Sequence, residues 1–174
     1  MKRVMIIGCS GSGKSTLAGH LGQVINLPVI HLDQHYFSSG WSEPSTEDWR
    51  RRIMKLVQGE RWVMDGNYAS TFDLRMPHAD TIIYVDLPSW QCLCRVINRT
   101  IRYHGEVRPS SAPGCPERFD LEFFHYVISY NFSRRPGILR RLDQEKTLGK
   151  QIIHLKGSRD VSRWAIQVQK TNAT

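Results

Sequence analysis

The stretch Gly8–Ser15, GCSGSGKS, has residue types and spacing suited to holding phosphate groups. It matches the pattern G-x-x-x-x-G-K-[ST] in full. Glycines allow the backbone to curl so that successive N–H groups point at phosphate oxygens. Lys14 is then expected to reach the β- and γ-phosphates of a nucleoside triphosphate, and the Ser15 hydroxyl to ligate Mg²⁺. The predicted loop residues are Gly8, Ser10, Gly11, Ser12, Gly13, Lys14 and Ser15.

Two aspartates follow short apolar runs that have the composition of buried strands. Asp33 comes directly after the second run, and Asp65 ends the third. Ligands of open parallel sheets bind at the carboxyl edge, so both side chains are expected there. We expect Asp65 to organise the metal with Ser15, and Asp33 to orient an acceptor hydroxyl or take its proton. Asp86, which precedes Pro88 by two residues, is expected to form a turn.

Three arginines form a stripe on one predicted helix. Arg95, Arg99 and Arg102 are spaced four and three apart, so they share a face. The opposite face is predicted to carry Leu93, Ile97 and Ile101. One interpretation is an amphipathic helix with a solvated charged side. The other is a phosphate clamp, because γ-phosphoryl transfer develops negative charge on the equatorial oxygens.

The stripe borders residues 104–118, which contain three prolines and two glycines. Long loops of this kind are often lids over active sites. Arg134 and Arg135 lie on the far side of the loop. We therefore predict a mobile lid at about 99–135 whose flanking arginines close around phosphates, with Arg99 and Arg134 contributing to catalysis.

Histidines and aromatic residues around Asp33 suggest two further sites. His31 and His35 flank Asp33, but a zinc site is disfavoured because no cysteine accompanies them, and Mg²⁺ prefers oxygen ligands. The aromatic residues of the same region form either an acceptor pocket or ordinary core packing; they are Tyr36, Trp41 and Trp49.

Composition limits the class of protein. The chain has 174 residues, 40% of them hydrophobic, which suits one domain spanning 1–174. Its net charge of +8 favours anionic partners. No apolar run approaches the roughly 18 residues of a membrane span, and the run 4–7 is shorter than the roughly 7 residues of a secretory signal. We therefore expect a cytoplasmic protein whose four cysteines are reduced.

Alternating elements predict an α/β fold with right-handed crossovers. Five apolar runs predict buried parallel strands at 3–7, 28–32, 61–65, 81–87 and 151–155. Helices are predicted at 14–24, 45–57, 89 to about 103 and about 160–169, with Ser45 and Ser89 as N-caps. The tail KTNAT is expected to fray. Together these elements predict a three-layer P-loop NTPase fold, a five-stranded parallel sheet with a helical lid.

Other phosphate-loop classes fit the sequence less well. A GTPase is expected to carry a guanine-reading N-K-x-D segment, and none occurs in the sequence. A chain of 174 residues also has no room for the further modules of a helicase or transporter ATPase. Among the classes of phosphate-loop protein, the sequence therefore favours a small kinase.

Several motifs together resemble a known family. The segments GCSGSGKSTLA, LD after the second strand, W-x-x-DGNY, VDLP and the lid arginines are similar to the FlaR-like DNA topology modulation proteins. These proteins look like small phosphate-loop kinases related to adenylate kinase, and the resemblance covers about residues 2–167. It implies that the ATP phosphates bind to Gly11–Thr16. It also implies that Asp65-Gly66 lies near Mg²⁺ and the acceptor.

The resemblance also implies roles for residues outside the phosphate loop. Arg95 and Arg99 are expected near the adenine and the phosphates, and the turn 156–160, with Ser158, borders the base. Arg75 is a candidate ligand of an acceptor phosphate. The chain departs from adenylate kinase after Asp-Gly, where Asn67-Tyr68 replaces a Phe-Pro-Arg run.

Two functions remain open on the sequence alone. The first is a Mg²⁺–ATP-dependent phosphotransferase acting on a small-molecule acceptor, whose identity the sequence does not reveal. The second is an ATP-binding regulator that acts on DNA topology or gene expression, which the positive charge permits. No helix-turn-helix or zinc-finger pattern supports direct DNA binding, and the oligomeric state is open.

Overall fold

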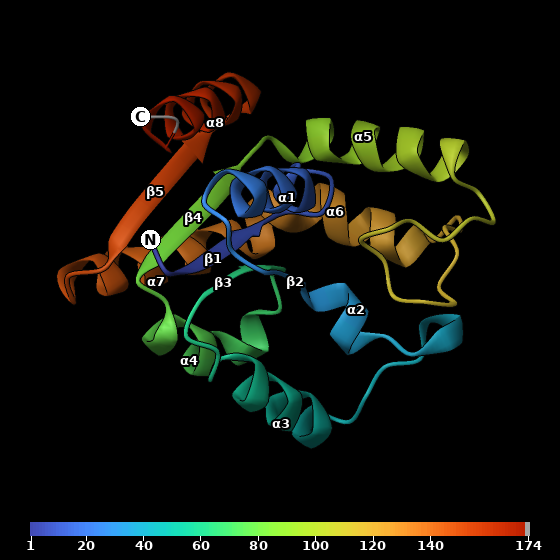
Figure 1. Cartoon of the computed structure of the whole chain (residues 1–174). Helices are drawn as coiled ribbons and strands as arrows, with labels where there is room; N and C mark the ends of the chain where they lie inside the picture. The colour runs from blue at the N-terminus through green and yellow to red at the C-terminus, as the bar shows by residue number, and fades with distance from the viewer. Residues whose placement is uncertain (173–174) are drawn as a thin grey trace.

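A five-stranded parallel sheet lies at the centre of the chain, in the order β2-β3-β1-β4-β5 (Figure 1). The strands are β1 (Arg3–Gly8), β2 (Val29–His31), β3 (Trp62–Asp65), β4 (Thr81–Asp86) and β5 (Gln151–Lys156). This computed structural model describes residues 1–172. The predicted α/β fold with five parallel strands is confirmed, and the strand ends differ from the prediction by at most one residue.

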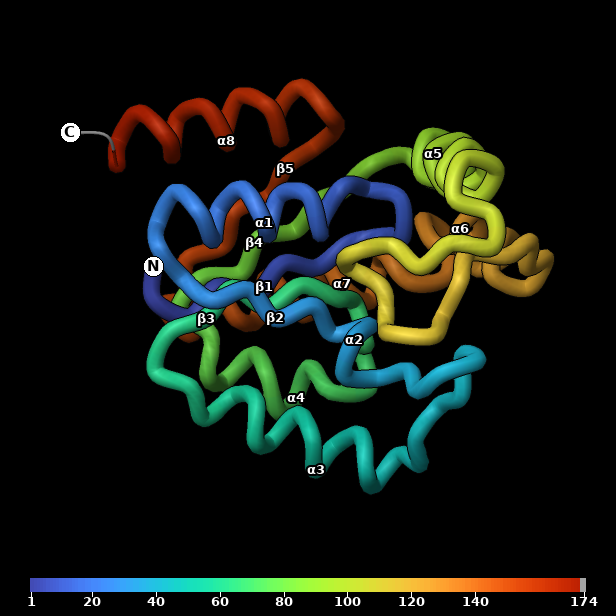
Figure 2. The backbone as a smooth tube through the Cα atoms, turned by 45° about the vertical axis from the view of Figure 1, so that its right-hand side comes forward, coloured from blue at the N-terminus to red at the C-terminus, as the bar shows by residue number. Residues whose placement is uncertain are grey.

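Helices cover both faces of the sheet. They are α1 (Lys14–Val24), α2 (Leu32–Tyr36), α3 (Thr46–Leu56), α4 (Phe72–Arg75), α5 (Ser89–Arg102), α6 (Leu121–Ser133), α7 (Arg135–Thr147) and α8 (Ser158–Asn172). Figures 1 and 2 show α1 and α8 together on one face, and α3 and α4 beyond the other. No helix within residues 1–172 is long and apolar enough to cross a bilayer.

The central strand β1 carries the phosphate loop at its carboxyl end. It pairs with β3 on one side and β4 on the other, and Val4–Ile7 are fully buried. Each fully buried aliphatic side chain stabilises the fold by about 1.5–3 kcal/mol. The edge strands β2 and β5 are less buried. The phosphate loop therefore follows a strand that is more deeply buried than the edge strands.

Two helix starts differ in how they are capped. Ser45 caps α3 as predicted, since its hydroxyl accepts a hydrogen bond from the Asp48 backbone N–H at 3.1 Å. Ser89 does not cap α5, because its hydroxyl instead accepts from the backbone N–H of Asn131, on α6, at 3.1 Å. Packing of α6 against α5 thus redirects the predicted cap.

The last helix is longer than predicted, because α8 runs over Ser158–Asn172 instead of about 160–169. The first three residues of the KTNAT tail are therefore helical, and positions 173–174 lie outside the described residues. The short helix α2, which carries Asp33, was not predicted as a helix.

The buried face of α5 also differs from the prediction. Cys92, Val96 and Thr100 are buried, whereas Ile101 is 61% exposed. Contact with the phosphate loop explains the difference, because a Cβ atom placed on Gly11 would lie 2.4 Å from the carbonyl oxygen of Cys92. The loop and α5 are therefore packed backbone to backbone.

Candidate active site

The phosphate loop curls between β1 and α1. Gly11 and Gly13 adopt left-handed conformations with φ of 81° and 97°, which favour glycine. The Lys14 ammonium donates a hydrogen bond to the Cys9 carbonyl at 2.8 Å and so lies across the loop. Cys9 itself is buried, and its thiol donates to the Val127 carbonyl at 3.7 Å. These contacts hold the loop open toward a cavity.

That cavity, the main cavity below, has a volume of about 1200 Å³. Six loop residues line it: Ser10, Gly11, Gly13, Lys14, Ser15 and Thr16. Two residues predicted to bind phosphate do not line it. Ser12 is buried, with an exposed fraction of 2%, and a Cβ on Gly8 would meet the Val85 carbonyl at 2.4 Å. Both positions therefore shape the loop from behind.

Asp65 lies in the main cavity with a histidine as its partner. Its carboxylate accepts a hydrogen bond from His31 Nδ1 at 2.6 Å, and the two residues are register partners in β2 and β3. This hydrogen bond, more than the opposing effect of burial, raises the pKa of His31 above its ordinary value. The pairing was not predicted, because the sequence does not show which strands are neighbours.

Asp33 lies in the first turn of α2 and also lines the main cavity. The Tyr68 hydroxyl donates a hydrogen bond to Asp33 Oδ1 at 2.7 Å. Burial, followed by the negative charge of Asp33, raises the pKa of Tyr68, so the phenol stays a neutral donor. Tyr68 thereby orients the Asp33 carboxylate, a role for which the sequence carries no signal beyond the DGNY motif.

Arg75 does not contact the main cavity. It is fully buried, and its guanidinium donates to the Gly66, Asn67 and Tyr68 carbonyls and to the Thr71 hydroxyl over 2.6–3.0 Å. Burial lowers the pKa of Arg75 to about 9. The predicted role as an acceptor-phosphate ligand is therefore wrong: Arg75 fixes the loop that follows Asp65.

Arg95 bridges the phosphate loop and the turn after β5. Its Nη2 donates to the Ser158 hydroxyl at 2.8 Å, and its Nη1 donates to the Ser12 carbonyl at 3.5 Å. Arg95 lines the main cavity, while Ser158 lines a second cleft beside it. The residues predicted to flank the adenine are thus joined directly.

Arg99 also lines the main cavity, but a carboxylate already contacts it. Its Nε lies 3.2 Å from Glu117 Oε1, and Arg108 Nε donates to the same oxygen at 2.5 Å. Thr100 adds a hydrogen bond to Glu117 at 3.3 Å. Burial, followed by the positive charge of Arg108, lowers the pKa of Arg99. Sequence reasoning missed Glu117, which lies in an irregular loop with no motif.

The other predicted arginines separate into different environments. Arg134 lines the main cavity and lies 6.0 Å from the ring of Tyr126. Arg102 instead lies over the ring of Tyr103, so only part of the predicted α5 stripe faces the main cavity. Arg135 points to Asp86 and not to the main cavity. The predicted pair Arg134–Arg135 is thus split by the helix break between α6 and α7.

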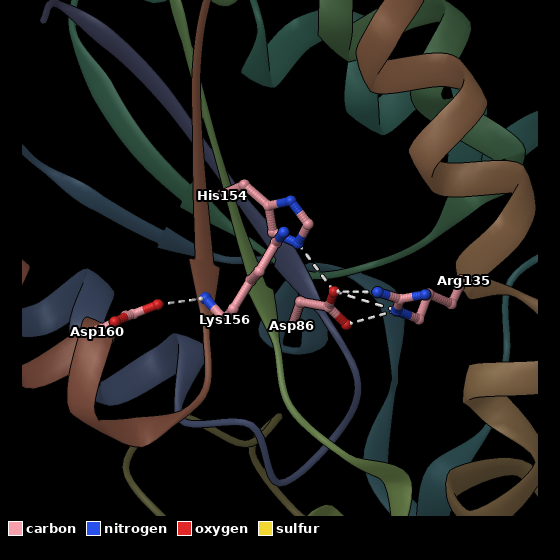
Figure 3. A network of polar contacts seen from close by, with 5 residues as sticks. All are labelled: Asp86, Arg135, His154, Lys156 and Asp160. Carbon is pink, nitrogen blue, oxygen red and sulfur yellow. Dashed lines mark hydrogen bonds and ion pairs between the residues drawn. The ribbon is translucent and has the colours of Figure 1, made fainter.

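Asp86 was predicted to form a turn, but it ends β4 and its carboxylate contacts the side chains of Arg135 and His154. Arg135 donates to both of its carboxylate oxygens at 2.9–3.0 Å, and His154 Nε2 lies 2.8 Å from Oδ2 (Figure 3). Burial opposes ionisation, but these hydrogen bonds lower the pKa of Asp86 below its ordinary value. Figure 3 also shows the nearby backbone contact of Lys156 with Asp160 in the turn after β5.

The loop 103–120 crosses from α5 toward α2, where Figure 2 draws it in yellow. Hydrogen bonds join it to the segment 34–41. Gln34 donates to the Pro109 carbonyl at 2.7 Å, Gly40 N–H to the Gly114 carbonyl at 2.9 Å, and Trp41 Nε1 to the Pro116 carbonyl at 2.9 Å. The loop therefore closes one side of the main cavity.

Aromatic residues line the side of the main cavity formed after β2. Tyr36 and Trp41 line it, whereas Trp49 is 3% exposed and packs edge-on against Tyr36. Core packing therefore applies to Trp49, and the acceptor-pocket interpretation of Tyr36 and Trp41 stays a prediction. Within residues 1–172, no group of three or more His, Cys, Asp or Glu side chains is arranged to hold a metal ion.

Comparison with known proteins supports the fold. No protein-family model matches the sequence, and no curated protein matches it. Shikimate kinase from Bacteroides thetaiotaomicron is similar in structure, with a TM-score of 0.58, 15% identity and 99% of each chain covered. Shikimate kinase from Acinetobacter baumannii, solved with shikimate, has a TM-score of 0.55 and 12% identity over 98% of this chain and 92% of that one. The chain therefore has the P-loop kinase fold of the shikimate kinase and adenylate kinase type.

Proposed function

We propose that this chain is a Mg²⁺–ATP-dependent phosphotransferase that acts on a small molecule. One observation carries the proposal: the phosphate loop with Lys14 opens into the same cavity as the carboxylates Asp33 and Asp65. The likeness to shikimate kinases supports it at the level of the fold. The resemblance to FlaR-like proteins, inferred from motifs, stays a prediction.

The ATP phosphates would lie on the loop, next to the N-terminus of α1, whose partial positive charge favours anions. Lys14, Arg99 and Arg134 would stabilise the charge of the transferring phosphoryl group. Arg95 and Ser158 would border the base. The segment 99–135 would act as a lid that excludes water, so that the acceptor is phosphorylated and ATP is not hydrolysed.

The donor set fits Mg²⁺, because the Ser15 hydroxyl and the Asp65 carboxylate supply the oxygen ligands that this ion prefers, and both line the main cavity. Bound Mg²⁺ would neutralise phosphate charge. Asp33, oriented by Tyr68, would take the proton of the acceptor hydroxyl. The acceptor oxygen then forms a bond to the terminal phosphorus while the bond to the ADP oxygen breaks.

The test is ADP formation from Mg²⁺–ATP with a panel of hydroxylated acceptors. We expect Lys14→Ala to abolish acceptor-dependent turnover, and Lys55→Ala, on the exposed side of α3, to leave it unchanged as the matched control. ATP affinity is measured in parallel by calorimetry. Tight ATP binding without phosphorylation of any acceptor would contradict the proposal.

A further inference from the structure

One wall of the main cavity has a chemistry that restricts the acceptor. We define the acceptor wall as the cavity-lining residues between positions 31 and 69. They are His31, Asp33, Tyr36, Phe37, Trp41, Glu43, Asp65, Gly66, Asn67, Tyr68 and Ala69. Within the described chain, this wall has three carboxylates, four aromatic rings of Tyr, Phe and Trp, and no lysine or arginine.

Nearby arginines make other contacts. Arg75, which the adenylate kinase resemblance would place on an acceptor phosphate, is fully buried on carbonyl oxygens. Arg50 pairs with Asp73 at 2.6 Å, and Arg52 donates to the His35 carbonyl at 2.8 Å. No lysine or arginine between residues 31 and 75 therefore lines the main cavity.

The rings of the acceptor wall form a continuous row. Centroids of Tyr68 and Tyr36 lie 4.7 Å apart, those of Tyr36 and Phe37 4.8 Å, and those of Phe37 and Trp41 5.0 Å. All four side chains are half-buried. Half-buried rings offer apolar surface on which another flat ring can pack, with the geometric preferences of aromatic pairs.

The cations of the main cavity lie on the other elements. They are Lys14, Arg95, Arg99, Arg108, Arg118 and Arg134. Glu117 contacts two of them, Arg99 and Arg108, and Asp120 lies 3.7 Å from a third, Arg118. Arg118 also lies over the Trp41 ring, 6.0 Å from its centroid. Lys14 and Arg95 donate to carbonyls of the phosphate loop, and Arg134 lies over the Tyr126 ring. A phosphate or carboxylate on the acceptor would instead meet Asp33 and Glu43, which accept hydrogen bonds from the neutral Tyr68 and Tyr36 hydroxyls, and like charges in a cleft repel.

We propose that the acceptor is a hydroxyl compound with a flat apolar ring and with no phosphate or carboxylate group. The ring packs on the row Tyr68–Tyr36–Phe37–Trp41, and the hydroxyl points to Asp33. This inference rests on the proposed function. It distinguishes the chain from enzymes that phosphorylate nucleoside monophosphates, and from the structural neighbour that was solved with shikimate.

The experiment compares matched compounds that differ in one anionic group. Adenosine is compared with AMP, thymidine with dTMP, and benzyl alcohol with mandelate, each in the presence of Mg²⁺ and a non-hydrolysable ATP analogue. Affinities come from ligand-detected NMR. We expect at least one neutral compound to bind, and every such compound to bind at least about tenfold more tightly than its anionic partner. Equal or tighter binding of the anionic members, or no binding by any neutral member, would overturn the inference.

Two variants test the acceptor wall itself. Trp41→Ala should weaken binding of the neutral ring compounds by about tenfold, because one packing surface is lost. Trp90→Ala, which removes a tryptophan that is 61% exposed on α5, is the matched control. Glu43→Gln should reduce the discrimination against monophosphates, whereas Glu60→Gln, an exposed residue outside the main cavity, should not. Unchanged binding in both wall variants would contradict the placement of the ligand.

Turnover separates this inference from the proposed function. The same compounds are also assayed with ATP. Phosphorylation of AMP or dTMP in preference to the nucleosides would contradict the proposed neutral acceptor but would still support phosphotransferase activity. Binding of neutral ring compounds without any phosphoryl transfer would contradict the proposed phosphotransferase activity but would still support the ligand preference proposed for the acceptor wall.

Discussion

Two aspartates end the strands on either side of the central strand, yet they have different surroundings. Asp65 ends β3 and pairs with His31, at the end of β2, at 2.6 Å. Asp86 ends β4 and pairs with His154, on β5, at 2.8 Å. Each pair thus joins a strand beside β1 to the neighbouring edge strand.

What separates the two aspartates is an arginine. Arg135 contacts both carboxylate oxygens of Asp86, so the charge of Asp86 is satisfied within the protein. Asp65 lies in the main cavity beside the phosphate loop, with the His31 imidazole as its partner. The same residue type at the same sheet edge is therefore neutralised within the protein in one half of the sheet and, by our proposal, binds a metal in the other.

The largest effect is expected for Asp65→Asn. Loss of a carboxylate that organises Mg²⁺ should lower acceptor-dependent turnover by about 10³-fold, which is about 4 kcal/mol of transition-state stabilisation. ADP formation measures it, and Asp143→Asn, on the exposed side of α7, is the control. Turnover within a few-fold of wild type would contradict the role given to Asp65.

Arg75→Met tests the element that positions Asp65. The substitution removes a fully buried guanidinium that makes four hydrogen bonds, and it leaves buried carbonyl oxygens without donors. We expect the free energy of unfolding to fall by about 3 kcal/mol, as measured by urea denaturation. Arg140→Met, an exposed position on α7, should change it by less than about 0.5 kcal/mol. Equal changes in the free energy of unfolding for the two variants would show that the Arg75 hydrogen bonds do not stabilise the loop after Asp65.

Asp86→Asn should have the opposite profile to Asp65→Asn. Because Arg135 and His154 lose their charged partner, we expect the free energy of unfolding to fall by about 2 kcal/mol while acceptor-dependent turnover changes less than about threefold. Asp73→Asn, in an exposed pair with Arg50, should cost less than about 1 kcal/mol. A large loss of turnover with unchanged stability would reverse the comparison between the two aspartates.

The smallest effect concerns pH. Hydrogen bonding to Asp65 raises the pKa of His31, so this pair stabilises the fold below the ordinary histidine value of 6.5, and the contribution is lost as the pH rises through the folded-state pKa. Asp86 has a lowered pKa, so its contribution is present at neutral pH and is lost as the pH falls through the folded-state pKa, below 3.8.

NMR titration of the His31 ring protons tests this assignment. The midpoint should lie above 6.5 in the wild type and should fall in Asp65→Asn. The His154 ring in the same sample serves as the internal comparison, since Asp65→Asn should leave its signals unchanged. An unaltered His31 midpoint in the variant would show that another group sets its pKa.

Local pattern was sufficient for much of the fold. The phosphate loop, the helix after it and the five strands are encoded by contiguous residues, and the boundaries of α1 match the prediction at both ends. Ser45 was correctly predicted as a cap because a cap depends on neighbours within three residues. Ser89 and the buried face of α5 were mispredicted because their partners, Asn131 and Gly11, are distant in sequence.

The candidate site divides in the same way. Lys14, Ser15, Asp33 and Asp65 were named from motifs and strand ends, and they line one cavity, although their roles stay predictions. Direct binding to DNA also stays a prediction. The sequence did not predict the role of Glu117 or the hydrogen-bond partners of Arg75 and Arg135. An isolated charged residue carries no pattern that identifies its partner.

By itself the sequence determined the fold class, the phosphate loop and the edge of the sheet at which the candidate site lies, because each follows from short-range spacing and from the parallel arrangement of buried strands. Only the tertiary structure decided which charged groups are neutralised. Charges interact through space, over a few ångströms, and the residues that approach so closely here are separated by 34 positions for His31–Asp65 and by 49 for Asp86–Arg135.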